Sequence, residues 1–452
     1  MQRWLTMSAA ALGRAIAKGD IDPVDLTQTY LDAIDTHPFT SRIYTIVTRD
    51  RALAEAQASS ERARLGQRKS ALDGVPVSWK DLFDSANVAT EAGSVLLENR
   101  VPAEDCEVLR CATELGLVCL GKTHLSELAF SGLGYNPRTA TPPCVNDHDA
   151  VSGGSSSGAA ASVAFGLAPL AIGSDTGGSV RIPAAWNDLV GLKTTTGRLS
   201  LAGVVPLCAR FDTVGPLCRS VEDAALALAA LEGRKPADLT NSTLEGRRLA
   251  ICDTVALDAL RPEPRAAFDQ AIDRLRAMGA VVERVEIPQV AAALSLSGVL
   301  FAAEAYGTWK DTIEANPDLM YEEILMRFRG GADVSAPDYV AAWQKLDRLR
   351  QDYYAATREF DAVLMPSSPI LPPNMEKLAR DHDYYVAENL LALRNTQWAH
   401  CGFSADLSGP VSDRAVFHTD NAYFLEAVDI VSHRSKLNTQ SHTAFRGFGG
   451  PQ

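Results

Sequence analysis

Stretches with helical periodicity followed by short apolar runs recur along this chain, and this alternation restricts the possible folds more than any other feature. EDCEVLRCATELG (104–116) precedes LVCLG (117–121), and SSGAAASVAFG (156–166) precedes APLAIGSD (168–175). A third pair, RAAFDQAIDRLRAMG and AVVERVEI, occupies residues 265–287. Helices that alternate with strands predict an α/β protein in which helices cover a sheet.

The same pattern continues outside these three pairs. Asp22-Pro23 predicts a helix start, because aspartate caps free N–H groups and proline suits the first helical position. GVPVSWK (74–80) predicts a short buried strand that ends at Lys80. Residues 289–358 are largely helical in pattern, and DAVLMP (361–366) predicts a return to a strand.

The composition excludes some classes of function. Of the 452 residues, 46% are apolar and 22% are charged, which suits one large α/β domain or two or three smaller ones. The formal net charge of −13 argues against a nucleic-acid-binding protein, which needs a basic face. We expect a small-molecule substrate and no direct contact with nucleic acid.

The cysteines and the N-terminus indicate a cytoplasmic protein. The eight cysteines form no C-x-x-C pair, so we expect reduced thiols, no disulfide framework and no metal site. Arg14 and Lys18 interrupt the small-residue stretch near the N-terminus, which therefore predicts an amphipathic helix and not a signal peptide. Residues 150–174 carry no charge, but their glycines, serines and Pro169 argue against a membrane span.

GSDTGGSVR (173–181) places a serine directly after two glycines. Glycine permits unusual backbone angles, so successive N–H groups of such a loop can converge on one point. Acyl transfer needs such donors where the oxyanion of its intermediate develops. Ser179 is therefore a candidate nucleophile, although a plain turn between a strand and a helix fits the same letters. No histidine except His148 lies within thirty residues of this loop, so the base has to come from elsewhere in the chain.

Lys80 is a candidate for that base. Burial at the end of an apolar strand disfavours the charged ammonium and lowers the lysine pKa toward the range of a general base. A lysine at a strand end is also a common surface charge. The serines of GGSSSG (153–158) could pass a proton between lysine and nucleophile, and the same letters are typical of a linker.

Two other motif matches lack the expected surroundings. GLVCLGKT (116–123) fits the phosphate-loop pattern, but its middle residues form the apolar core of a predicted strand, whose N–H groups belong to the sheet. GSSSG (154–158) fits the nucleophile elbow of α/β-hydrolases, but polar, turn-like residues precede it. An ordinary esterase that uses Ser156 remains an alternative.

The lysine segment, the serine segment and the glycine-rich loop, in this order, resemble the amidase signature family. The run GGSSSGAAASVAFGLAPLAIGSDTGGSVRIPAAWNDLVGLKTTTGRLS (153–200) is similar to the family signature, and LDGVPVSWKDLFD (72–84) resembles its upstream lysine segment. The resemblance extends more weakly from the N-terminal helices to about residue 400. It implies the amidase-signature fold, an α/β fold with a mixed central β-sheet covered by helices on both faces.

The resemblance also implies a catalytic triad of serine, cis-serine and lysine. Ser179 would be the nucleophile, Ser155 the bridging serine after a cis Gly154–Ser155 peptide bond, and Lys80 the neutral base. The oxyanion hole would consist of the backbone N–H groups of Thr176, Gly177, Gly178 and Ser179. The supporting residues would be Asp175, Arg181 and Ser156. The resemblance implies no metal and no organic cofactor.

Residues 401–452 resemble a different family, the molybdopterin-binding subunit of xanthine dehydrogenases. The most specific part is NTQSHTAFRGFGGPQ (438–452), in which Arg446 matches an arginine near that family's substrate site. We therefore predict an amidase-signature domain over 1–400, C-terminally incomplete, and a fragment over 401–452 that is not an independent domain. So short a fragment cannot build its native core, and we expect no oxidoreductase activity from it.

Three functions are consistent with these resemblances. The first is a hydrolase that forms an acyl-enzyme with a small carboxamide and releases ammonia or an amine. The second is the A-subunit of a glutamyl/aspartyl-tRNA amidotransferase, which would supply ammonia to partner subunits. The third is an inactive chimeric product with an incomplete amidase domain. Protein partners would be further copies of the chain or amidotransferase subunits, and no membrane partner is expected.

Overall fold

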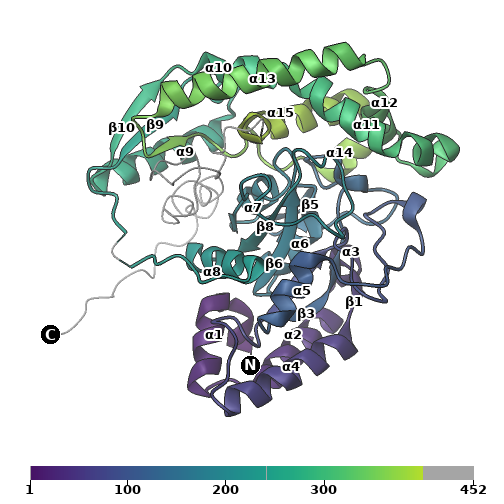
Figure 1. Cartoon of the computed structure of the whole chain (residues 1–452), viewed down its shortest axis with the longest axis vertical. Helices are drawn as coiled ribbons and strands as arrows, with labels where there is room; N and C mark the ends of the chain where they lie inside the picture. The colour runs from purple at the N-terminus through teal and green to yellow at the C-terminus, as the bar shows by residue number, and fades with distance from the viewer. Residues whose placement is uncertain (1, 241, 401–452) are drawn as a thin grey trace.

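The computed structural model describes residues 2–240 and 242–400. The fragment predicted at 401–452 lies outside the described residues. The described chain is a layered α/β structure with a six-stranded sheet in its middle and a smaller sheet apart from it (Figure 1). The α/β fold class expected from the sequence is confirmed.

Helices begin the chain, and their start signals act as predicted. The Asp22 carboxylate accepts the Val24 N–H at 2.8 Å, and Pro23 occupies the first helical position of the second α-helix. Ser8 caps the first α-helix, which buries Leu12 and Ile16 as an amphipathic helix does. These elements are η1 (Gln2–Thr6), α1 (Ala9–Lys18), α2 (Pro23–Thr36), α3 (Thr40–Ile43) and α4 (Arg49–Arg64).

A mixed sheet forms the centre of the molecule. Its strands are β1 (Tyr44–Val47), β2 (Pro76–Lys80), β3 (Val118–Thr123), β6 (Leu170–Asp175), β7 (Val190–Gly191) and β8 (Thr213–Cys218). They lie in the order β1-β3-β2-β6-β8-β7; β2 is parallel to β3 and β6, and the other pairs are antiparallel. Every residue of β2, β3, β6 and β8 is buried, which explains their nearly continuous apolar sequences.

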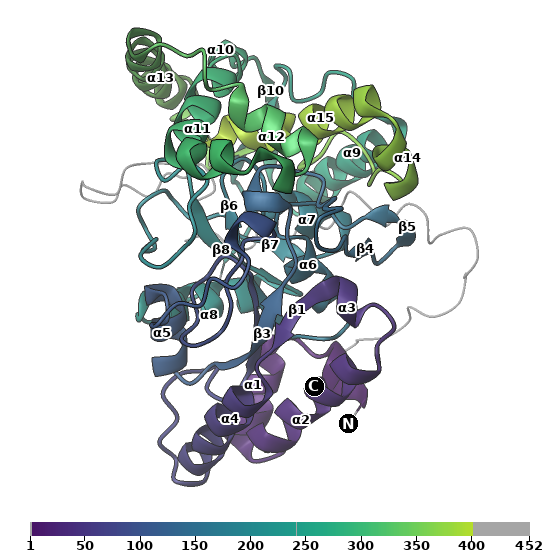
Figure 2. The same ribbon diagram turned by 90° about the vertical axis from the view of Figure 1, so that its right-hand side faces the viewer.

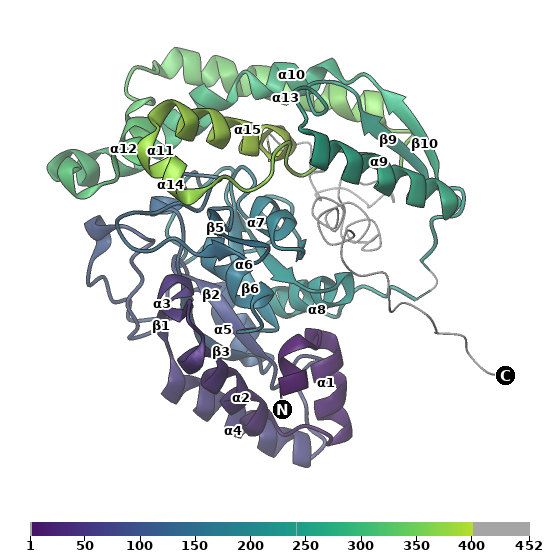
Figure 3. The same cartoon turned by 180° about the vertical axis from the view of Figure 1, so that it is seen from behind.

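Helices flank this sheet (Figures 2 and 3). The further elements of this part are η2 (Val95–Leu97), α5 (Glu107–Glu114), η3 (Glu127–Ala129), β4 (Pro143–Cys144), β5 (Asp147–Val151), α6 (Ser157–Ala164), α7 (Arg181–Trp186) and α8 (Val221–Glu232). α4 packs on β3, α6 on β6 and α8 on β8. β4 and β5 pair with each other, and Ala150 of β5 also forms an isolated antiparallel bridge with Asn374. The sequence analysis missed this strand pair because the residues of β5 are mainly polar.

A separate second sheet is a difference from the single sheet that the sequence predicts. It consists of β9 (Arg248–Cys252), β10 (Val281–Val285) and β11 (Ala362–Leu364), which are parallel in the order β10-β9-β11. α9 (Pro262–Ala277) connects β9 to β10. The sheet and α9 share an apolar core of their own, which includes Leu249, Phe268 and Leu275, so these strands bury their apolar side chains without joining the larger sheet.

The last part of the described chain is mainly helical, as predicted for 289–358. It comprises α10 (Pro288–Leu294), α11 (Ser297–Ala315), η4 (Pro317–Leu319), α12 (Glu322–Arg329), α13 (Ala336–Thr357), α14 (Met375–Arg380) and α15 (His382–His400). Within the described residues, the segment Pro288–Ala315 is long and apolar enough to cross a membrane by length and composition alone. In this structure α11 packs on α12 and α13, a contact that core helices of globular proteins also make.

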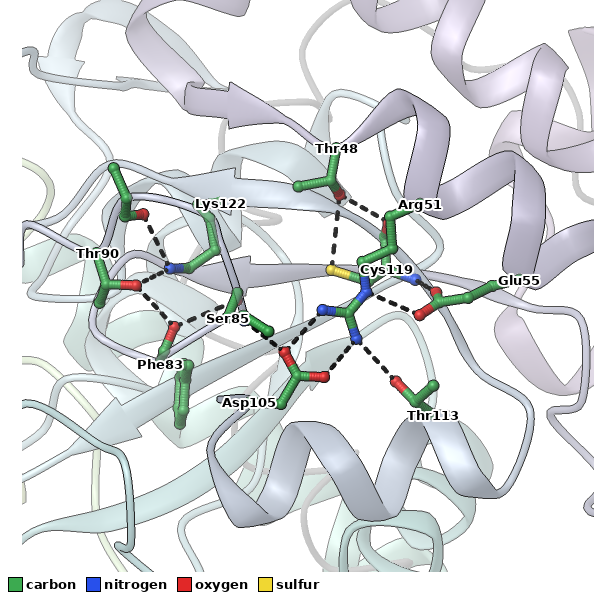
Figure 4. Close-up of polar contacts among 12 residues, drawn as sticks. Thr48, Arg51, Glu55, Phe83, Ser85, Thr90, Asp105, Thr113, Cys119 and Lys122 are labelled. Atoms are coloured by element: carbon green, nitrogen blue, oxygen red, sulfur yellow. Dashed lines mark hydrogen bonds and ion pairs between the residues drawn. The ribbon is translucent and has the colours of Figure 1, made fainter. Parts of the chain in front are cut away.

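β3 carries the match to the phosphate-loop pattern, and the prediction of a strand there is confirmed. The Lys122 ammonium donates to Oγ1 of Thr90 at 2.8 Å (Figure 4). It also pairs with Oδ1 of Asp81 at 3.1 Å. The Cys119 N–H donates to Oε2 of Glu55 at 2.7 Å. The lysine and this N–H group are therefore engaged inside the protein and unavailable to a phosphate.

The cysteines are thiols, as expected. The seven cysteines within the described residues form no disulfide, and Cys401 lies outside those residues. Burial raises the pKa of the Cys119 thiol to about 11, and the Thr48 hydroxyl contacts its sulfur at 3.7 Å (Figure 4). These thiols are suited to packing in the core.

Candidate active site

The glycine-rich loop connects the end of β6 to the start of α7. Asp175, the last residue of β6, is fully buried, and its carboxylate accepts the Gly178 N–H at 2.7 Å. The Arg181 guanidinium, in the first turn of α7, donates to both oxygens of the same carboxylate at 2.9 Å. One ion pair therefore joins the two ends of the loop, and the supporting role of Asp175 and Arg181 stays a prediction.

Lys80 ends β2 and is completely buried. Its Nζ donates to Oγ of Ser155 at 2.6 Å and to Oγ of Ser174 at 2.8 Å. Burial lowers the pKa of the Lys80 ammonium to about 7, although the nearby charges of Asp175 and Asp212 act in the opposite direction. The lysine is thus poised to exchange a proton with Ser155 near neutral pH.

Ser155 lies in the turn before α6, and its peptide bond to Gly154 is cis, as the resemblance implies. The Gly154 N–H donates to the Gly132 carbonyl at 2.8 Å. A Cβ atom at residue 154 would lie 2.5 Å from the backbone nitrogen of Gly134, so only glycine fits here. The turn is therefore packed against the segment around Gly132, and this packing aims the Ser155 hydroxyl at Lys80.

Ser179 lies beside the Ser155 turn. The Ser156 N–H donates to the Ser179 carbonyl at 3.1 Å, so the turn and the loop are joined by their backbones. Ser179 is 4% exposed, and its hydroxyl makes no hydrogen bond with any of the described residues. The structure therefore brings Lys80, Ser155 and the loop of Ser179 together and leaves the Ser179 hydroxyl unengaged.

The backbone N–H groups of the loop differ in their availability. Within the described residues, the N–H groups of Thr176, Gly177 and Ser179 donate to no acceptor. The N–H of Gly178 is already donated to Asp175. Three of the four predicted oxyanion donors are therefore open, and the fourth braces the loop.

Ser174 is a site residue that the sequence analysis missed. Besides accepting from Lys80, it receives a hydrogen bond at its carbonyl from the Ser156 hydroxyl, at 3.2 Å. β2 and β6 are parallel neighbours with Trp79 opposite Ile172, so Lys80 and Ser174 come from adjacent strand ends. The alignment of parallel strand ends is the signal that could have identified it.

The alternative that uses Ser156 receives little support from this geometry. Ser156 is fully buried and its hydroxyl is engaged with the Ser174 carbonyl. β5 ends at Val151, five residues before Ser156, and does not lead directly into the turn as an elbow requires. Across 2–240 and 242–400, no hydrogen bond joins an imidazole ring to the hydroxyl of Ser155, Ser156 or Ser179.

Comparison with known proteins finds matches to two family models. The family model of amidases matches residues 25–414, and a model of a molybdopterin cofactor-binding domain matches residues 386–452. The A-subunit of the glutamyl-tRNA(Gln) amidotransferase from Marinobacter nauticus is 32% identical over 403 residues, which cover 80% of this chain and 83% of that protein.

Two solved structures are also similar. One is a vestigial protein complex said to reveal the evolutionary origins of an s-triazine catabolic enzyme; its matching chain is 26% identical, with a TM-score of 0.82 and coverage of 94% of this chain and 98% of that one. The other is a peptide amidase from Stenotrophomonas maltophilia, 26% identical, with a TM-score of 0.74 and coverage of 95% and 97%.

Proposed function

Since this chain belongs to the amidase family, we propose that it cleaves an amide C–N bond through Ser179, with Ser155 and Lys80 as the proton relay. The observation that carries the proposal is the buried Lys80 ammonium, with a pKa of about 7 and a 2.6 Å hydrogen bond to Ser155. A general base works best when its pKa lies near the operating pH.

In the acylation step, Oγ of Ser179 attacks the amide carbonyl carbon. Its proton passes to Oγ of Ser155, whose own proton passes to the neutral amine of Lys80. The carbonyl oxygen becomes an oxyanion that the N–H groups of Thr176, Gly177 and Ser179 stabilise. When the C–N bond breaks, the proton returns from Lys80 through Ser155 to the leaving nitrogen, which departs as ammonia or an amine.

In the second step, water hydrolyses the acyl-enzyme. The water oxygen attacks the ester carbon, and its proton enters the same relay. Breaking the bond to Oγ of Ser179 releases a carboxylic acid and returns the proton to the serine. Serine, lysine and backbone donors supply every group that these steps use, so no cofactor enters the mechanism.

For the substrate, the relatives favour the ammonia-supplying role over a free-standing hydrolase of small carboxamides. The relative from Marinobacter nauticus is named as the A-subunit of a glutamyl-tRNA(Gln) amidotransferase. We therefore propose glutamine as the first substrate to test and amidotransferase subunits as partners in a cytoplasmic complex. The similarity to a peptide amidase keeps the free-standing amidase as the second candidate.

The match to a molybdopterin cofactor-binding domain does not lead to a second activity. Its described part, residues 386–400, lies in α15, where Asn395 donates to the carbonyls of Ala256 and Pro366 at 2.9 and 2.8 Å. Thr396 donates to the Gly177 carbonyl at 2.7 Å. Both side chains are engaged within the amidase fold and are not available to a cofactor. Their contacts extend the amidase fold at least to Thr396, and the domain boundary near residue 400 stays a prediction.

A serine-directed fluorophosphonate probe tests the proposal on the full chain without knowledge of the substrate. We expect peptide mass spectrometry to find the adduct on Ser179, and heat-denatured protein and Lys80→Ala to remain unlabelled. Ser179→Ala and Lys80→Ala should each lower glutamine hydrolysis at least about 1000-fold without changing the circular dichroism spectrum. Full activity in either variant would overturn the triad.

Assays on the same protein preparation distinguish the amidotransferase subunit, the free-standing amidase and the inactive chimeric product. Glutamine hydrolysis that appears only when the other amidotransferase subunits are added supports the amidotransferase role. Hydrolysis of small carboxamides or peptide amides by the isolated chain supports the free-standing amidase. A folded chain that is neither labelled nor active supports the inactive chimeric product.

A further inference from the structure

The peptide group between Gly177 and Gly178 is hydrogen-bonded at both of its ends. Its carbonyl accepts the Thr396 hydroxyl at 2.7 Å, and its N–H donates to Oδ1 of Asp175 at 2.7 Å. A peptide group is planar, with its N–H and C=O pointing in opposite directions. Fixing both ends therefore fixes the rotation of the whole group.

This peptide group lies between two of the open N–H groups of the loop. The N–H of Gly177 belongs to the preceding peptide group and the N–H of Ser179 to the following one. Both neighbouring groups share a Cα atom with the fixed one, so fixing it restricts the positions that their N–H groups can take. We propose that Thr396 is a positioning residue that holds the oxyanion-binding loop in its active orientation. The proposal rests on the proposed function of that loop.

The packing around Thr396 leaves the loop little room for another backbone conformation. Thr396 is 3% exposed, and a Cβ atom on Gly178 would lie 2.2 Å from its Oγ1 and 2.7 Å from Cδ1 of Ile182. Gly178 has φ of 142°, in a region that favours glycine. Gly178 therefore has a backbone angle that favours glycine, and it lies in direct contact with Thr396 of α15.

α15 is also anchored by the residue next to Thr396. Asn395, the residue before Thr396, donates to the carbonyls of Ala256 and Pro366, which follow β9 and β11 of the second sheet. The Thr396 hydroxyl is therefore held in place by a part of the fold that does not contact the substrate-cleaving serine directly. The second sheet supports the loop through α15.

The chemical consequence concerns the transition state. Without the Thr396 hydroxyl, the buried Gly177 carbonyl lacks its partner and the peptide group is free to rotate. Donors for an oxyanion matter only when the oxyanion forms, so their misalignment lowers kcat and leaves KM nearly unchanged. If the hydroxyl had only a structural role, its loss would lower the thermal stability of the protein and would not lower kcat selectively over KM.

The test compares Thr396→Val, which keeps the shape but removes the donor, with Thr396→Ser, which keeps the donor. We expect Thr396→Val to lower kcat and the fluorophosphonate labelling rate about 10- to 100-fold, somewhat less than the loss of a direct oxyanion donor. Thr396→Ser should stay within a few-fold of the original chain. The matched control is Thr357→Val, which removes a buried hydroxyl that donates to the Tyr353 carbonyl at 2.9 Å on α13, and it should leave kcat unchanged.

Amide hydrogen exchange of a peptide that spans 173–181 gives a readout independent of activity. We expect faster exchange in Thr396→Val than in the original chain or in Thr396→Ser. Unchanged kcat or unchanged exchange in Thr396→Val would overturn the proposal, as would equal impairment of the serine variant. If the original chain is inactive and unlabelled, the proposed function fails, and the exchange comparison alone decides whether Thr396 holds the loop.

Discussion

At the scale of single residues, Lys80 illustrates how burial changes the chemistry of a side chain. Its ammonium is fully buried, and its hydrogen-bond acceptors are serine oxygens instead of a carboxylate. Desolvation favours the neutral amine, and this is the form that accepts a proton. The Lys122 ammonium on the neighbouring strand is equally buried but contacts the Asp81 carboxylate at 3.1 Å. Lys122 is therefore part of a buried ion pair, whereas no carboxylate contacts the Lys80 ammonium among the described residues.

The lowered pKa of Lys80 predicts the pH dependence of amide hydrolysis. The protonated lysine cannot accept a proton from Ser155, so activity should be lost as the pH falls below about 7. We expect kcat/KM to decrease about tenfold per pH unit below this value and to reach a plateau above it. Initial rates between pH 5 and 9 measure this, with circular dichroism at each pH as a control for folding. A profile that stays flat down to pH 5 would contradict the role of Lys80.

At the scale of elements, α6 depends on small residues to approach its neighbours. A Cβ atom on Gly158 would lie 2.5 Å from the Ile43 carbonyl oxygen and 2.7 Å from the His124 backbone nitrogen. These atoms belong to the backbone and cannot rotate away. α6 directly follows Ser155 and Ser156, so its position also determines that of the serine turn.

We therefore expect Gly158→Ala to lower the free energy of unfolding by about 1–3 kcal/mol, the range typical of overpacking. The matched control is Gly307→Ala in the middle of α11, where a Cβ atom would meet nothing within 4 Å. Alanine forms helices more readily than glycine, so this variant should be more stable by up to about 1 kcal/mol. Urea denaturation measures both, and equal effects in the two variants would contradict this account of α6.

At the scale of the whole molecule, the matches to two family models overlap near the end of the described chain. The amidase match reaches residue 414, and the molybdopterin-domain match begins at residue 386, inside α15. Thr396 nevertheless contacts the glycine-rich loop, so the amidase fold includes at least this part of the shared stretch. If the predicted fragment after residue 400 is a separate piece, the amidase fold should form without most of it.

A truncated chain tests this division. We expect a chain that ends at residue 414 to keep the labelling of Ser179, with a thermal midpoint within about 4 °C of the full chain, which corresponds to less than about 3.5 kcal/mol at the usual unfolding entropy per residue. A chain that ends before α15, at residue 381, serves as the comparison and should lose both. Loss of folding in the 414-residue chain would show that the remaining residues belong to the same folding unit.

The sequence by itself determined the features that depend on neighbouring residues. The cap at Asp22, the buried strands that end at Lys80 and Asp175, and the glycine-rich loop before α7 all follow from local patterns. The family resemblance added the grouping of Lys80, Ser155 and Ser179, which no local pattern contains. The roles of these three residues remain predictions.

Only the tertiary structure decided the features that depend on distant segments. The separate second sheet exists because β9, β10 and α9 enclose their own apolar core. Ser174 contacts Lys80 because two parallel strands end side by side, and Thr396 contacts Gly177 across 219 positions of the chain. Such contacts arise from packing between elements. The periodicity and spacing of a single sequence predict the elements themselves but not which of them pack together.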